Sequence, residues 1–265
     1  MLKPIVDFFL NPWNAPIWLA LAGLVAGALW LYERRTRSLS PQTPAPAAPP
    51  PPPLSTADAA LIERVLAACA EQLGAAEPPG VDDGRAMLRA ALGRFLRGGD
   101  LRGRRVATLL AERHTHAAQD LAFAIAEAAP NADAWLDASA VAALNDARAA
   151  IVSGEKARAL GARSAAALSW LGRLYLRRGR LGEAVSALEA ADAALAHEEK
   201  LKRAGLLACL ADVALKRGDR PAARAYLEAA LANYADAGEA GAEGVQDARA
   251  RLARLIGSSA TGDEN

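Results

Sequence analysis

The sequence predicts an all-α protein, and three observations support that expectation. Alanine, leucine, arginine and glutamate dominate the 265 residues, while aromatic side chains make up only 5% of them; this composition favours helix over sheet. Apolar residues in the second half recur three and four positions apart, as one face of a helix requires. The pattern that starts at Leu168 also starts at Ala134 and at Leu207, which indicates an array of similar helical units.

Residues 1–37 are expected to anchor the chain in a membrane. Residues 15–32 are an uncharged, mostly apolar run of 18 residues, which as a helix of roughly 27 Å would cross a hydrocarbon core. Trp18 lies near one end and Trp30 and Tyr32 near the other, as in interfacial aromatic belts. The alternative is a cleaved signal peptide, but Trp30 and Tyr32 stand where a cleavage site needs small residues.

The charges beside this run predict its orientation. Three arginines follow it directly: Arg34, Arg35 and Arg37. Because only Lys3 and the terminal amine precede it, the positive-inside rule places the C-terminal side in the cytoplasm. We therefore expect a single-pass protein, as in a bacterial inner membrane. Gly23 and Gly27 form a GxxxG pattern, which permits a homodimer of spans but also serves as ordinary small-residue filler.

Residues 38–55 are expected to be a linker. They contain eight prolines between Pro41 and Pro53, and consecutive prolines adopt an extended polyproline II form. A semi-rigid spacer is predicted, with a ligand for an SH3-like domain as the alternative. The helical domain then covers residues 56–257, with Ser55 or Thr56 as the first helix cap, and residues 258–265 are expected to be a disordered tail.

The clearest helical unit covers residues 164–198, where two apolar stripes are separated by Gly179, a residue that helix C-termini prefer. Units at 131–163 and 199–236 flank it. The earlier unit has Asn145 in place of the glycine, which asparagine permits because it tolerates left-handed geometry. The residues expected to pack the helices together are Leu168, Leu171, Gly172, Tyr175, Gly179, Ala184, Leu188, Ala191, Leu207, Leu210, Ala211, Gly218, Ala223, Leu227 and Ala230. Gly172 facing Ala184, and Ala211 facing Ala223, would let the paired helices approach closely.

This series of Leu-Gly, Tyr, Gly, Ala, Leu and Ala at these intervals resembles the tetratricopeptide (TPR) repeat. The resemblance implies an α-solenoid of about three to four helical pairs, closed by a C-terminal capping helix over residues 245–256. The earlier unit is degenerate, because Asp137 and Gly154 depart from the pattern. A weaker half-copy precedes it, from Leu88 to Gly99.

In TPR-like stacks the first helix of each pair lines a concave surface, which the resemblance implies as the partner-binding groove. Its residues off the packing stripe are Trp135, Ser139, Ser169, Arg173, Arg177, Asp212 and Lys216. Three cations against one carboxylate favour an acidic or C-terminal peptide as ligand. The lysines and asparagines with which some TPR proteins clamp a terminal carboxylate are absent, since Trp135, Ser139 and Trp170 stand at those positions.

Evidence for other chemistry is weak. His114 and His116 are two positions apart, so they do not share a helix face, and no phosphate-loop, nucleophile-elbow or zinc motif occurs. We expect no enzyme, no metal and no cofactor. Seven arginines fall within 25 residues: Arg89, Arg94, Arg97, Arg102, Arg104, Arg105 and Arg113. They suggest either an ordinary solvated face or contact with acidic lipid or protein; without interleaved aromatic residues, nucleic-acid binding is not expected.

Two functions remain open. The first is a membrane-anchored, non-catalytic adaptor or scaffold that binds a protein or peptide in the concave groove. The second is a structural component of a membrane envelope complex, in which the anchor and the helix at residues 57–74 drive self-association and the solenoid is a spacer.

Overall fold

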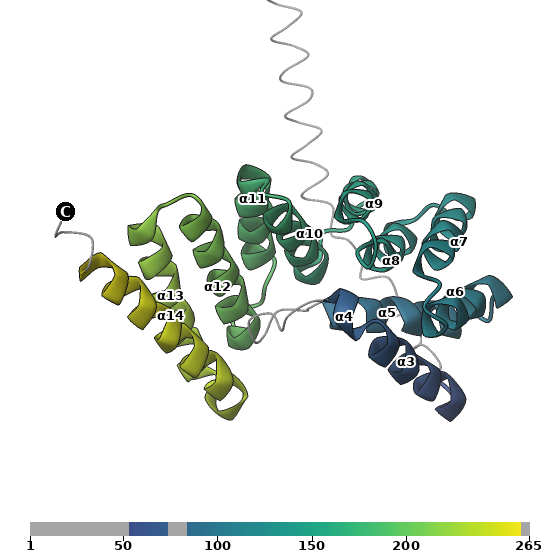
Figure 1. Cartoon of the computed structure of the whole chain (residues 1–265), viewed down its shortest axis with the longest axis horizontal. Coiled ribbons are helices and arrows are strands. Elements are labelled where there is room, and N and C mark those ends of the chain that lie inside the picture. The colour runs from purple at the N-terminus through teal and green to yellow at the C-terminus, as the bar shows by residue number, and fades with distance from the viewer. Residues whose placement is uncertain (1–52, 74–83, 261–265) are drawn as a thin grey trace, which may run out of the picture. The chain divides into compact units, whose positions relative to one another are not determined.

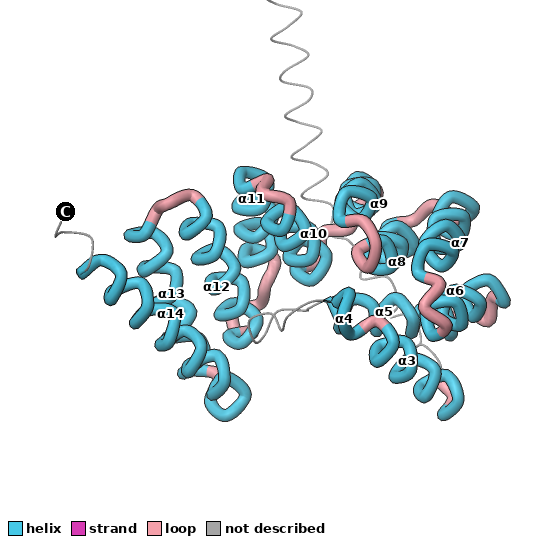
Figure 2. The backbone as a smooth tube through the Cα atoms, viewed as in Figure 1, coloured by secondary structure: helices cyan, strands magenta, loops and turns pink. Residues whose placement is uncertain are grey.

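The computed structural model describes residues 53–73 and 84–260, with side chains up to residue 256. They belong to a compact unit that runs from Pro52 to Asn265. Every regular element in the described ranges is a helix and none is a strand (Figure 2). The prediction of an all-α chain is therefore confirmed for this part.

The helices follow one another with short connections (Figure 1). They are α3 (Thr56–Ala68), α4 (Ala70–Leu73), α5 (Gly84–Arg97), α6 (Leu101–Ala111), α7 (Thr115–Ala128), α8 (Ala132–Ala142), α9 (Ala147–Ala159), α10 (Ala165–Arg177), α11 (Leu181–Ala193), α12 (Lys200–Lys216), α13 (Arg220–Asp236), the 3₁₀ turn η2 (Gly238–Gly241) and α14 (Ala242–Ala260).

Consecutive helices pack in pairs through the second half of the domain. α8 packs on α9, α10 on α11 and α12 on α13, and the pairs are joined by contacts of α9 with α10 and of α11 with α12. These pairs coincide with the units expected at 131–163, 164–198 and 199–236. Packing of each helical pair on its neighbours fits an α-solenoid.

The first helices are connected differently. α3 packs on both α5 and α6, and α5 also reaches forward to α8, while α7 lies against α6 and α8. The start of α3 is fixed by Ser55, whose hydroxyl accepts a hydrogen bond from the Asp58 amide at 3.1 Å. Of the two caps that the sequence allowed, the structure therefore selects Ser55.

The backbone conformation predicted for the turns is found at two positions and not at a third. Gly179 and Gly218 have φ angles of +72° and +78° just after α10 and α12, a left-handed conformation that glycine adopts without steric cost. Asn145 does not take this conformation, because Arg113 is the only non-glycine residue with positive φ in the described ranges. Its side-chain amide instead donates a 3.0 Å hydrogen bond to Gln119 Oε1. The left-handed assignment of Asn145 was thus wrong.

Small side chains bring the paired helices close together. A Cβ added to Gly172 would lie 2.8 Å from Leu188 Cγ and 3.3 Å from the Leu188 backbone nitrogen. The nearest atoms therefore belong to Leu188, where the sequence had placed Ala184. Ala184, Ala211 and Ala223 are fully buried.

We expect Gly172→Ala to lower the free energy of unfolding by about 1 kcal/mol, because overpacking of about 2 kcal/mol exceeds a gain in helix propensity of roughly 1 kcal/mol. Gly182 in α11 is a matched control, since a Cβ there meets nothing within 4 Å. Gly182→Ala should instead stabilise the protein. Denaturant unfolding of both variants measures the difference, and equal stabilities would contradict the close approach at Gly172.

A second, smaller core closes the C-terminal end. Tyr234 and four alanines form this cluster between α12, α13 and α14: Ala204, Ala208, Ala230 and Ala248. Cβ atoms added to Gly241 or Gly244 would lie closer than 2.5 Å to Tyr234, so η2 and α14 approach this residue tightly. The capping helix continues to Ala260, beyond the domain end expected at residue 257.

The predicted membrane span at 15–32, its glycine pair, the proline linker up to residue 52 and the end of the tail at 261–265 lie outside the described residues. Within the described residues, no helix combines the length and apolar character that crossing a membrane requires.

Candidate functional site

Four of the seven residues predicted on α8, α10 and α12 are buried. The side chains of Trp135, Ser139, Ser169 and Arg173 keep only 6%, 0%, 5% and 2% of their accessible surface. These four residues are therefore largely covered in the fold, and their role in binding a partner stays a prediction.

Ser139 of α8 forms hydrogen bonds to both adjacent helices. Its hydroxyl donates to the Ala150 carbonyl of α9 at 2.8 Å and accepts from Trp170 Nε1 of α10 at 3.0 Å. One side chain of α8 thereby joins both adjacent helices, and the indole that reaches it is itself 1% exposed. Ser139 and Trp170 are therefore structural contacts.

Arg173 is a buried cation in the middle of α10. Its guanidinium carbon lies 5.3 Å from the centre of the Trp170 ring. Burial lowers the pKa of Arg173 to about 10, with Cys209 opposing this effect and Arg177 adding to it. The guanidinium therefore stays charged at neutral pH, inside the domain.

The other three predicted residues lie toward the surface. Asp212 pairs with Arg251 of α14, and Lys216 Nζ donates to the Leu176 carbonyl at 3.2 Å. Arg177 is exposed in the last turn of α10. Asp212 and Lys216 thus link neighbouring helices, and a ligand at these positions stays a prediction.

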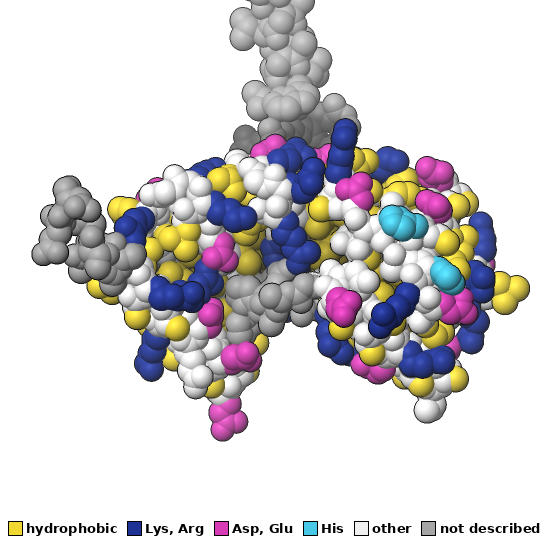
Figure 3. Space-filling model, viewed as in Figure 1, with side chains coloured by type: hydrophobic (Ala, Val, Ile, Leu, Met, Phe, Trp, Pro, Cys, Tyr) yellow, Lys and Arg dark blue, Asp and Glu magenta, His cyan; other side chains and the backbone are white. Residues whose placement is uncertain are grey.

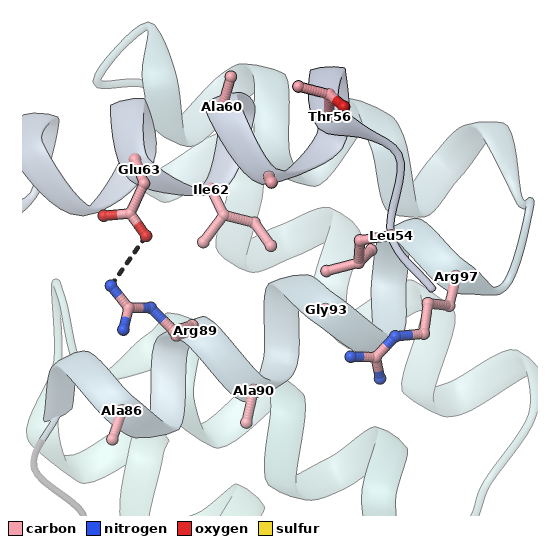
Figure 4. Close-up of a pocket in the computed structure, with 11 residues that line it drawn as sticks. Leu54, Thr56, Ala60, Ile62, Glu63, Ala86, Arg89, Ala90, Gly93 and Arg97 are labelled. Carbon is pink, nitrogen blue, oxygen red and sulfur yellow. Dashed lines mark hydrogen bonds and ion pairs between the residues drawn. The ribbon is translucent and has the colours of Figure 1, made fainter. Parts of the chain in front are cut away.

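A hollow lies elsewhere, between α3 and α5, and we call it the α3–α5 groove (Figure 4). Its volume is about 710 Å³. It is lined by Leu54, Thr56, Ala59, Ala60, Ile62, Glu63, Ala86, Arg89, Ala90, Gly93 and Arg97. Small apolar side chains make most of this lining, because α3 and α5 face each other there through alanines and a glycine.

Charged side chains flank this apolar lining. Arg89 Nη2 of α5 lies 2.8 Å from Glu63 Oε1 of α3, across the groove, as Figure 4 shows. Arg97 stands near the opposite end, beside Leu54. The groove thus combines an apolar floor with two cations and one carboxylate. The sequence did not reveal it, since alanine occurs on helices both in cores and on surfaces.

A second, smaller hollow of about 270 Å³ lies at Trp135. Phe123 of α7 and Trp135 of α8 form its aromatic wall, with ring centres 6.4 Å apart. Lys156 Nζ of α9 lies 3.8 Å from the centre of the Trp135 ring, a cation–π contact. Trp135 is thus the one predicted groove residue that lines a hollow described here.

The arginine-rich run is mostly neutralised by carboxylates. Four of its members have such partners: Arg89 with Glu63, Arg94 with Asp137, Arg102 with Asp100 and Arg104 with Asp58. On the face seen in Figure 3, basic and acidic side chains are interspersed. Arg97, Arg105 and Arg113 have no ion pair within the described ranges. The run is therefore no continuous basic patch.

Metal-ligating side chains form no cluster in the described ranges. No three of the histidine, cysteine and carboxylate side chains there are arranged to hold a metal ion. Cys69 and Cys209 are both free and buried. Burial raises the pKa of the Cys209 thiol to about 11 and also raises that of Cys69, so both stay protonated at neutral pH.

Comparison of the sequence with models of known protein families and with curated proteins finds no significant match.

Proposed function

We propose that this chain is a membrane-anchored, non-catalytic scaffold of TPR-like helical pairs that binds an apolar segment of a protein partner in the α3–α5 groove. The observation that carries the proposal is the groove itself, about 710 Å³ of mostly apolar space on a domain of consecutively packed helices. Helix-in-groove recognition uses this kind of surface, in which apolar anchors of an amphipathic helix fill a hydrophobic channel.

The lining indicates what kind of segment would fit. Ala59, Ala60, Ala86 and Ala90 project little from their helices, so a partner backbone can approach α3 and α5 closely. Arg89 and Arg97 outnumber Glu63. An acidic residue beside the apolar anchors would gain charge-assisted hydrogen bonds from these arginines. An acidic ligand is therefore still expected, but its proposed binding surface lies on α3 and α5 and not on α10 and α12.

A photo-crosslinking residue at Ala60, in the full chain in its native membrane, tests this proposal. We expect an adduct with a different polypeptide. Ala90→Glu should weaken that adduct at least about tenfold, because it places a carboxylate within the apolar floor. The matched control is the same crosslinker at Ala225, an exposed alanine of α13 outside the groove.

Each outcome separates the two functions. An adduct of Ala60 with a second copy of the chain would favour the self-associating structural component. Equal labelling from Ala60 and Ala225, or an adduct that Ala90→Glu leaves unchanged, would contradict binding in the groove.

A further inference from the structure

The turn between α5 and α6 presents an unusually exposed apolar side chain. Leu101 keeps 82% of its accessible surface, compared with 54% for Ile256, the next most exposed large apolar residue in the described part. The turn is well defined, because the Asp100 carboxylate caps α6 by accepting from the Arg102 amide at 2.9 Å. Leu101 therefore points outward from a capped helix start, where no described part of the chain buries it.

Arginines flank this leucine in the sequence. Four of them fall between positions 97 and 105, against the single carboxylate of Asp100: Arg97, Arg102, Arg104 and Arg105. Arg105 lies four positions after Leu101 on α6, so the two side chains share one helix face. Arg97 and Arg105 are exposed and have no carboxylate partner in the described ranges. We call Leu101 with Arg97 and Arg105 the Leu101 tip.

The tip lies close to the point where the chain enters the domain. Arg104 Nη2, three residues after Leu101, lies 2.6 Å from Asp58 Oδ1 in the first turn of α3. Arg97 lines the same groove as Leu54, which directly follows the proline-rich segment in the sequence. The side of the domain that carries the tip is therefore the side at which the linker joins it.

We propose that the Leu101 tip is a second contact of this protein with the membrane, specific for anionic lipid. Leu101 enters the boundary between headgroups and acyl chains, and Arg97 and Arg105 bind lipid phosphates. An apolar residue flanked by cations matches the chemistry of that boundary. The acyl chains on one side of it are hydrocarbon, and the anionic headgroups on the other side carry negative charge.

The contact takes its strength from the proposed anchor, and to that extent it rests on the proposed function. A linker leaves the domain free to rotate, but it holds the tip at a high effective concentration near the bilayer. One leucine and two arginines are then enough to hold the tip against lipid. The contact would orient the α3–α5 groove, which Arg97 also lines, relative to the membrane.

An environment-sensitive fluorophore on Leu101→Cys in the full chain tests the proposal. The two native cysteines are buried, so the introduced thiol is the accessible one of the three. We expect a blue shift with phosphatidylcholine vesicles that contain phosphatidylglycerol, and none with phosphatidylcholine alone. Arg97→Gln and Arg105→Gln should each reduce the fraction of molecules that show the blue shift at position 101 about fivefold at low salt. Leu160→Cys, at an exposed leucine after α9, is the matched control.

Flotation of the chain with neutral vesicles reports on the anchor separately. Flotation without any shift at position 101 in anionic vesicles would overturn the tip and leave the anchor standing. A shift in anionic vesicles without flotation in neutral ones would support the tip and contradict the anchor. Equal blue shifts at positions 101 and 160 would also contradict lipid contact by the Leu101 tip. The same holds for a blue shift that appears without lipid as the protein concentration rises.

Discussion

Arg94→Met is expected to lower the free energy of unfolding by about 3 kcal/mol, because it leaves a buried carboxylate without its counter-charge. Arg94 Nε of α5 donates to both oxygens of Asp137 in α8, at 2.8 and 3.0 Å. The Asp137 side chain is only 5% exposed, so water cannot replace the lost guanidinium. Denaturant unfolding at neutral pH measures this loss.

The loss should depend on pH in a definite direction. Burial raises the pKa of Asp137 to about 6 from an ordinary value of 3.8, although the Arg94 guanidinium opposes the shift. Without Arg94 the pKa in the folded state rises further, while the unfolded value is unchanged. Since the folded variant binds the proton more tightly, it loses stability as pH rises from about 4 to above 6. The free energy of unfolding of Arg94→Met should therefore approach that of the parent protein at pH 4.5.

Arg89→Met is the matched control for that experiment. Arg89 and Glu63 form an ion pair of similar length, but both side chains are more than half exposed. Such surface pairs contribute between 0 and about 1 kcal/mol, and we expect a correspondingly small, pH-independent change. A loss for Arg94→Met no larger than that for Arg89→Met would show that Asp137 is not the buried partner described here.

Trp170→Ala is expected to cost about 4 kcal/mol, within the range for removing a fully buried indole. Trp170 fills the space between the first two of the three helical pairs and holds Ser139 through its indole nitrogen. Trp170→Phe should cost less, since the ring volume is largely kept and one buried hydrogen bond of about 1 kcal/mol is lost.

Ser139→Ala separates the contribution of the Trp170 ring packing from that of its hydrogen bond. It removes the acceptor of the indole and the donor to Ala150 while leaving the ring in place. We expect it to match Trp170→Phe more closely than Trp170→Ala in urea unfolding. If Ser139→Ala destabilised the protein as much as Trp170→Ala, the hydrogen bonds rather than the packing would hold these pairs together.

The helical pairs could be predicted from sequence because their signals are local. The stripe through Leu168, Leu171 and Tyr175 needs only a three- or four-residue spacing, and Gly179 marks a turn by its own conformational freedom. Burial of polar residues has no such local signal. Ser139 is buried and accepts a hydrogen bond from Trp170, 31 positions later, and no spacing rule predicts that partnership.

Surface charge and surface hollows also depend on residues that are far apart in the sequence, so local patterns do not predict them. The arginine-rich run looks basic when only its neighbours in sequence are counted. In the fold, Asp58 and Asp137 reach it from positions more than 40 residues away. Likewise, the α3–α5 groove exists because two alanine-rich faces from different helices meet, and either face alone reads as an ordinary helix surface.

One aromatic ring lies in the core at the C-terminal end of the domain. Tyr234 is the only large side chain in the cluster of buried residues that joins α12, α13 and α14, and the other members are alanines. Each alanine removes little apolar area from water, so most of the buried apolar area at this end comes from the tyrosine ring and from the larger, partly buried residues packed against the cluster: Leu201, Leu207, Leu231 and Val245. Detachment of α14 would expose this cluster to water, so the last helix shields the apolar end of the helical array from solvent.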